Sequence, residues 1–84
     1  MVSRKEIAAA GQAMVQTYLK KGARVPQHAH LAAQWIYVLQ GALDVSLAGH
    51  PGIVVREGEV LYVPAEALHQ AEALDDTFVL DVRT

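Results

Sequence analysis

The sequence predicts an all-β fold, a sandwich or a barrel, because short apolar runs and turn signals alternate along the whole chain. The runs are rich in Val, Ile, Leu, Tyr and Trp, and the turn signals include KKG, QG, AGHPG and EGE. Strands that recur about every 8–12 residues with such signals between them are typical of these two architectures. The expected strands are residues 12–20, 24–28, 34–40, 43–48, 52–56, 59–64, 68–73 and 77–82.

The segment ahead of these strands contains the one helical candidate, a turn or two at Arg4–Ala10, where the alanines favour a helix. Glu6, Gly11 and Gln12 interrupt the apolar residues of this segment, so we expect an ordinary N-terminus and not a signal peptide. No run approaches the roughly 18 apolar residues that span a bilayer. We therefore expect a soluble cytoplasmic protein with no membrane partner.

The composition limits the size of the fold and the kinds of partner. The 84 residues form one expected domain, residues 1–84, without a linker or a repeat. A chain this short buries only about 60% of its unfolded surface, yet 52% of its residues are apolar, which suggests that a second copy covers part of the surface. The formal charge of −2 provides no basic surface for nucleic acid. No cysteine is present, so any metal must be held by His, carboxylate or amide ligands.

The third expected strand, QWIYVLQ, is apolar on both faces. Side chains alternate along a strand, so Gln34 shares one face with Ile36 and Val38, whereas Trp35 and Tyr37 point the other way. In so small a domain the second face needs a cover of its own. We expect a homodimer in which the partner subunit covers Trp35 and Tyr37. The alternative is that these rings pack under a loop or under the N-terminal segment.

Two histidines precede this run. His28 and His30 are two residues apart, so on a strand both side chains project from one face toward one point. Gln34 follows four residues later, and His69 lies much further along the chain. Imidazole nitrogens and an amide oxygen are suitable ligands for a divalent first-row metal. The spacing alone leaves open whether these histidines are ligands or hydrogen-bonded structural residues.

The spacing around these residues resembles the two motifs of the cupin superfamily. The first motif, at residues 22–41, reads Gly, five residues, His, one residue, His, three residues, Gln, six residues, Gly. The second, at residues 58–73, contains Gly, five residues, Pro, one residue, Glu, two residues, His. The resemblance implies a small β-barrel or jelly roll, the double-stranded β-helix. It also implies a divalent metal inside the mouth of the barrel, held by His28, His30, Gln34 and His69.

The sequence departs from the cupin pattern at three positions. Gln34 replaces the usual first-motif glutamate, Glu66 the usual second-motif glycine, and Ala73 the usual terminal asparagine. With a neutral amide and neutral imidazoles the metal keeps its full charge, which makes it a stronger Lewis acid and attracts an anionic substrate. We therefore expect non-oxidative chemistry on a carboxylate-bearing or enolic small molecule. If amide and carboxylate ligands are interchangeable, dioxygenase chemistry is the alternative. Nickel, zinc, iron(II), manganese and copper(II) all accept these donors.

The chain is also similar to the small single-domain cupins of pectin and alginate breakdown, which linearise unsaturated uronates. Their aspartate near the metal matches Asp81, which implies a general acid or base. The alternative is a rim residue paired with Arg83 or Arg24. Arg24 has the same parity as His28, so we expect it to reach the cavity and bind a substrate carboxylate. These relatives continue beyond the position of Thr84 with a Pro- and Arg-containing tail, so any substrate contacts in that tail would be absent here.

Gln16 and Tyr18, from the preceding strand, are further cavity candidates, and His50 is expected to be a solvated turn residue outside both motifs. Three functions are compatible with the sequence. The first is a metal-dependent enzyme of sugar acid metabolism, and the second is a metal-dependent dioxygenase. The third is a non-catalytic binding or sensing module, which we disfavour because no DNA-binding segment accompanies the barrel.

Overall fold

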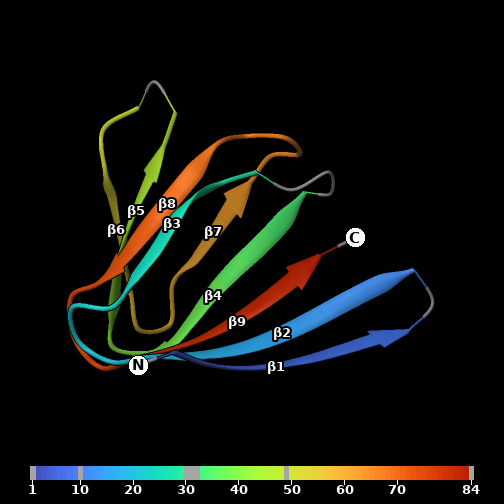
Figure 1. Ribbon diagram of the computed structural model, residues 1–84, viewed down its shortest axis with the longest axis horizontal. Coiled ribbons are helices and arrows are strands. Elements are labelled where there is room, and N and C mark those ends of the chain that lie inside the picture. Colours follow the sequence, from blue (N-terminus) through green and yellow to red (C-terminus); the bar gives the residue numbers. More distant parts are fainter. Residues whose placement is uncertain (1, 10, 30–32, 49, 84) are drawn as a thin grey trace.

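A computed structural model describes residues 2–9, 11–29, 33–48 and 50–83, with only the backbone described at positions 2, 3, 27 and 28. Within these described residues, nine strands form two antiparallel sheets (Figure 1). One sheet has the order β1-β2-β9-β4-β7 and the other the order β3-β8-β5-β6. The strands are β1 (Val2–Ala9), β2 (Gln12–Leu19), β3 (Arg24–His28), β4 (Gln34–Gln40), β5 (Ala42–Leu47), β6 (Ile53–Arg56), β7 (Val60–Val63), β8 (His69–Ala73) and β9 (Thr77–Arg83).

The all-β prediction is confirmed. Each of the eight expected strands is present, with ends that differ by at most one residue from those expected. The turn signals therefore placed the strand boundaries well, since glycine and proline favour turns over strand interiors. None of the described residues forms a helix long and apolar enough to cross a membrane.

The first strand, β1, was not expected. The helical interpretation of Arg4–Ala10 is wrong, because the backbone from Val2 to Ala9 pairs antiparallel with β2, from Val2↔Leu19 to Ala9↔Gln12. Helix propensity differs between residues by less than about 1 kcal/mol, so it is overridden when an adjacent strand offers a continuous ladder of backbone hydrogen bonds. This hairpin places β1 at the edge of the five-stranded sheet.

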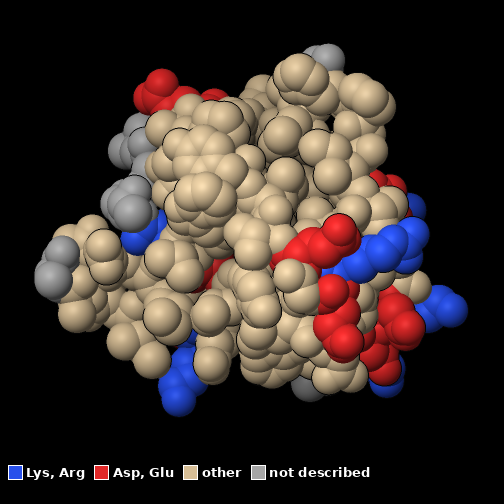
Figure 2. Space-filling view, turned by 180° about the vertical axis from the view of Figure 1, so that it is seen from behind, with Lys and Arg blue, Asp and Glu red and all other residues tan. Residues whose placement is uncertain are grey.

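The hydrophobic core lies between the two sheets. Its buried members come from both sheets and are Leu19, Ile36, Val38, Leu43, Val45, Val55, Val63, Ala73 and Val79. In Figure 1 the sheets converge at one end of the molecule and diverge toward the end of β1, the start of β2 and the C-terminal end of β9. Seen from behind, the charged side chains gather mostly on one side, and uncharged residues cover most of the remaining visible surface (Figure 2).

Strand β4 has the two faces that its sequence predicts. Gln34, Ile36 and Val38 are 2%, 5% and 0% exposed, so they face the interior. Trp35, by contrast, is 50% exposed and packs against Tyr62 of β7, with ring centroids 4.9 Å apart. β1 lies at the opposite side of the same sheet, so the N-terminal strand does not cover Trp35.

Candidate functional site

A cavity of about 390 Å³ opens between the two sheets and is lined by both. Its walls are mostly aliphatic, and a cavity of this volume suits a small molecule. A few polar groups interrupt the apolar lining. They are Arg4, Thr17, Gln34, His69, Asp81 and Arg83.

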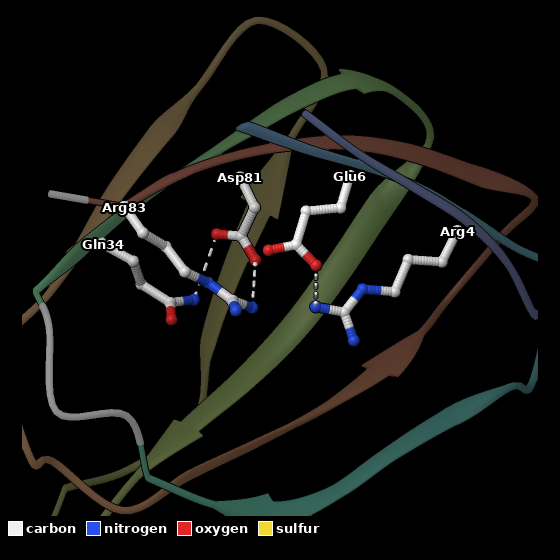
Figure 3. A network of polar contacts seen from close by, with 5 residues as sticks. All are labelled: Arg4, Glu6, Gln34, Asp81 and Arg83. Carbon is white, nitrogen blue, oxygen red and sulfur yellow. Dashed lines mark hydrogen bonds and ion pairs between the residues drawn. The ribbon is translucent and has the colours of Figure 1, made fainter. Parts of the chain in front are cut away.

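Gln34 comes from the first motif and lies deeply buried in the wall of the cavity. It is only 2% exposed, and its Nε2 donates a hydrogen bond to Asp81 Oδ1 at 3.1 Å. An ionised carboxylate only accepts hydrogen bonds, so Asp81 fixes the direction of the amide and turns Oε1 away from itself (Figure 3). That oxygen is buried and has no hydrogen-bond partner in the part of the chain that the structure describes. Gln34 therefore presents a fixed, unpaired acceptor, as a ligand position requires.

His69 begins β8 and is 4% exposed. Its Nδ1 lies 2.9 Å from the carbonyl oxygen of Ala67. A carbonyl only accepts hydrogen bonds, so Nδ1 is the donor in this contact. Metal-binding histidines are held in this way in proteins, because the bond at one nitrogen sets the tautomer and the ring orientation at the other.

The two histidines of the first motif are placed only in part. The backbone of His28 is directly opposite His69 in the β3–β8 pair. Its side chain and the whole of His30 lie outside the described residues. Within the described part of the chain, no three His, Cys, Asp or Glu side chains form a group that could hold a metal. The four-ligand set therefore stays a prediction, although the buried amide oxygen and the oriented imidazole fit a divalent first-row metal.

Asp81 lies on the inner face of β9 and lines the cavity. Its side chain is 15% exposed, and its Oδ2 accepts a long contact of 3.5 Å from Arg83 Nη2. Burial raises the pKa of the Asp81 carboxyl above its usual value, and the neighbouring positive groups, Arg83 first, oppose this rise. Asp81 thus combines features of both expectations, since it faces the cavity and is paired with Arg83. It is not paired with Arg24.

The expectation that Arg24 faces the cavity is wrong. Its side chain is 78% exposed, and its Nε donates to Glu72 Oε1 at 3.1 Å outside the barrel. The cause is a register shift in β3, where Val25 pairs with Ala71 but His28 pairs with His69. Three steps along β3 thus oppose two steps along β8, so the alternation is reversed across this β-bulge. Val25, and not Arg24, lines the cavity.

Gln16 and Tyr18 do not line the cavity either, so this expectation is also wrong. The inward positions of β2 are Val15, Thr17 and Leu19. Gln16 and Tyr18 alternate with them and point to the outer face. His50 is exposed, as a turn residue outside both motifs should be.

The cavity contains two arginines whose role the sequence did not reveal. Arg83 shares the parity of Asp81, so its position could have been found from alternation along β9. Arg4 gave no such signal, because its segment was interpreted as helical. It faces inward because β1 pairs with β2, where Arg4 is opposite the cavity residue Thr17.

Comparisons with known proteins agree with this architecture. The family model of the cupin domain matches residues 14–82. KdgF from a Halomonas species is 30% identical, and the match covers 98% of this chain and 78% of that one with a TM-score of 0.88. An RmlC-like cupin from Shewanella frigidimarina is 25% identical over 98% of this chain and 74% of that one, with a TM-score of 0.87.

A third structure shows the fold alone, since its sequence is only 14% identical. It is an RmlC-like cupin from Methanocaldococcus jannaschii with a double-stranded β-helix fold, and the match covers 100% of this chain and 80% of that one with a TM-score of 0.91. The prediction of a jelly-roll barrel is thereby confirmed. No curated protein sequence matches the chain.

Proposed function

Because this chain belongs to the cupin superfamily, we propose that it is a metal-dependent enzyme that acts non-oxidatively on a small carboxylate-bearing or enolic molecule derived from a sugar. The substrate would enter the cavity between the sheets, which Gln34, His69 and Asp81 line.

The unpaired Oε1 of Gln34 is the observation that carries this proposal. A buried acceptor without a partner lowers the free energy of unfolding by about 1–3 kcal/mol. Its retention in the cavity wall is best explained by a ligand that binds to this oxygen. We assign the metal to the four neutral donors His28, His30, Gln34 and His69. A divalent metal bound by them would serve as a Lewis acid on a substrate oxygen.

Asp81 has two tasks in this proposal. Its Oδ1 accepts the hydrogen bond that orients the Gln34 amide, and the residue also lines the cavity. The carboxyl group is therefore placed to accept a proton from a bound substrate and to return it at a neighbouring atom. Rearrangement of an enolic compound consists of such a transfer and needs no oxidant.

The likeness to KdgF supports a uronate as the substrate class. The sequence resembles the small cupins of pectin and alginate breakdown, which linearise unsaturated uronates, and Asp81 matches their aspartate. A uronate also supplies the carboxylate that a metal site with only neutral ligands attracts.

The experiment is turnover of an unsaturated uronate by the purified chain. Loss of the ultraviolet absorbance of the conjugated double bond is followed beside an oxygen electrode, and the metal content is measured by elemental analysis. We expect one metal per chain, consumption of the uronate and no oxygen uptake. His69→Ala removes a proposed ligand and should abolish both metal and turnover, whereas Arg24→Gln, outside the cavity, should change neither.

Other results would select the other candidates. Oxygen consumed in proportion to turnover would replace the proposal by a dioxygenase. Absence of metal after reconstitution, together with ligand binding, would replace it by a binding module.

We also propose that the chain forms a homodimer through the outer face of its five-stranded sheet. The register brings five side chains into one row across this face, namely Ile7, Met14, Val82, Trp35 and Tyr62. Four of them are at least 42% exposed, with Val82 half-buried. Contiguous apolar surface of this kind is typical of an interface, and two copies of one sheet face can pack together with two-fold symmetry.

A further inference from the structure

Two arginines of the cavity have no part in the proposed metal site. Arg4 comes from β1 and Arg83 from β9, the strands that flank β2 in the five-stranded sheet. Both line the cavity. Figure 3 shows their guanidinium groups pointing toward one another, with the carboxylates of Asp81 and Glu6 on one side of them. The first and last strands of the chain thus bring two positive groups to one wall.

The charges on this wall favour an anion. The described residues that line the cavity carry two guanidinium groups, Arg4 and Arg83, and only one carboxylate, Asp81. Asp81 is already engaged by Gln34 through Oδ1. The one remaining carboxylate nearby, Glu6, pairs with Arg4 but does not itself line the cavity.

Arg83 has more donors than its contacts use. Its side chain is 19% exposed, and the ion pair with Asp81 is long, at 3.5 Å. Its Nε is buried and has no partner among the described residues. A guanidinium group carries five N–H donors in a planar fork that matches an oxyanion with two oxygens. A ligand oxyanion would satisfy the donors that the protein leaves unpaired.

Arg4 is less firmly held. Its contact with Glu6 is 3.7 Å long and joins side chains that are 52% and 50% exposed. Ion pairs of this kind contribute little to stability, so Arg4 can exchange Glu6 for a ligand at small cost. The two arginines therefore differ, Arg83 being fixed beside Asp81 and Arg4 being adjustable at the sheet edge.

We propose that Arg4 and Arg83 form an anion subsite that binds the carboxylate of the small molecule entering the cavity. The subsite lies on strands β1 and β9, apart from the histidines of β3 and β8. It makes β1, the strand that sequence patterns missed, part of the ligand-binding wall. This inference rests on the proposed function only for the kind of molecule that is bound. The contacts of the two arginines come from the structure alone.

The test compares three sugars that share one ring and differ at a single carbon: glucuronate, glucose 6-phosphate and glucose. Their binding to the full chain is measured by calorimetry, both as purified and after treatment with a chelator. The variants are Arg83→Gln, Arg83→Lys and Arg4→Gln. Arg24→Gln is the matched control, because Arg24 is an arginine paired on the outer surface.

We expect the parent to prefer glucuronate to glucose in both preparations. Arg83→Gln should weaken glucuronate binding by about tenfold or more, the scale of a lost charged hydrogen bond. Arg83→Lys should recover only part of the affinity, since an ammonium lacks the planar fork. Arg4→Gln should weaken binding by about threefold to tenfold, and Arg24→Gln should have no effect. Tighter binding of glucose 6-phosphate than of glucuronate, with the same arginine dependence, would assign the subsite to phosphate and overturn the carboxylate.

The inference is overturned if the parent does not distinguish glucuronate from glucose, or if Arg4→Gln and Arg83→Gln bind glucuronate as the parent does. Metal content, measured on the same preparations, separates this result from failure of the proposed function. If the parent takes up no metal but binds glucuronate in a way that depends on the arginines, the subsite is supported and the proposed enzymatic function is not. If the parent binds metal and its turnover is unchanged by substitution of either arginine, the enzymatic function is supported and the subsite is not.

Discussion

Gln34 and Asp81 are joined by a hydrogen bond of 3.1 Å between the central strands β4 and β9. Gln34 is the nearly isosteric replacement of a carboxylate that the cupin motif usually has at this position. A carboxylate there would lie against Asp81 and repel it, whereas the amide donates to Asp81 and keeps its oxygen for a ligand. The amide at position 34 and the aspartate at position 81 are therefore coupled through this hydrogen bond.

Substitution of Asp81 separates its two tasks. Asp81→Asn keeps an acceptor for Gln34 Nε2, so metal affinity should stay within about threefold of the parent, less than the 10–100-fold typical of a lost supporting residue. The same variant lacks a carboxyl to transfer a proton, and turnover should fall by about 10²–10⁴-fold. Asp81→Leu, which also removes the acceptor, should lose metal affinity by about 10–100-fold. Equal metal loss in both variants would contradict this division.

Metal should stabilise the parent much more than Gln34→Leu. With metal in hundredfold excess over the dissociation constant, binding adds about 2.7 kcal/mol to the free energy of unfolding. Gln34→Leu fills similar space but removes both the unpaired oxygen and the hydrogen bond to Asp81, which should lower its metal-free stability by about 1–3 kcal/mol, so each protein is compared with its own metal-free form. Thermal unfolding with and without metal gives the comparison. A variant that is stabilised as strongly as the parent would show that Oε1 is not a ligand.

The outer apolar row predicts a dimer that one charge should break. Trp35→Lys places a positive charge within the row Ile7, Met14, Val82, Trp35 and Tyr62, where burial of an unpaired ion is costly. Sedimentation or light scattering should show a dimeric parent and a monomeric Trp35→Lys. Leu74→Lys is the control, since Leu74 is 40% exposed but lies in the connection between β8 and β9. A monomeric parent would remove the dimer proposal.

Two glycines with the same backbone conformation should respond differently to alanine. Gly41 and Gly58 have φ values of 87° and 83°, in the left-handed region that costs other residues about 1–2 kcal/mol. A Cβ at Gly58 would meet nothing within 4 Å, but one at Gly41 would overlap the carbonyl oxygen of Asp76. Chemical denaturation should therefore show a loss of about 1–2 kcal/mol for Gly58→Ala and about 1–3 kcal/mol more for Gly41→Ala. Similar losses would mean that the β8–β9 turn gives way.

The alternation of side chains along each unbroken strand could be followed in the sequence, and it determined which residues of that strand face the interior. The run QWIYVLQ by itself predicted that Gln34 faces the interior with Ile36 and Val38, and the buried fractions of 2%, 5% and 0% confirm it. The turn signals placed eight strands, and the motif spacing pointed to the barrel. These inferences succeed because side-chain direction within an unbroken strand depends only on the two-residue repeat of the backbone.

Only the tertiary structure decided which arginines face the cavity. Arg24 was expected inside, but the β-bulge between Val25 and His28 reverses the alternation and sends it outward to Glu72. Arg4 was assigned to a helical turn, but pairing with β2 makes its segment a strand and turns it inward. Bulges and strand pairing depend on a partner far away in the sequence, and a shift of one residue moves a side chain to the other face. The sequence therefore determined eight of the described strands and the spacing of the expected metal ligands, while the partners of β1 and β3 determined which arginines line the cavity.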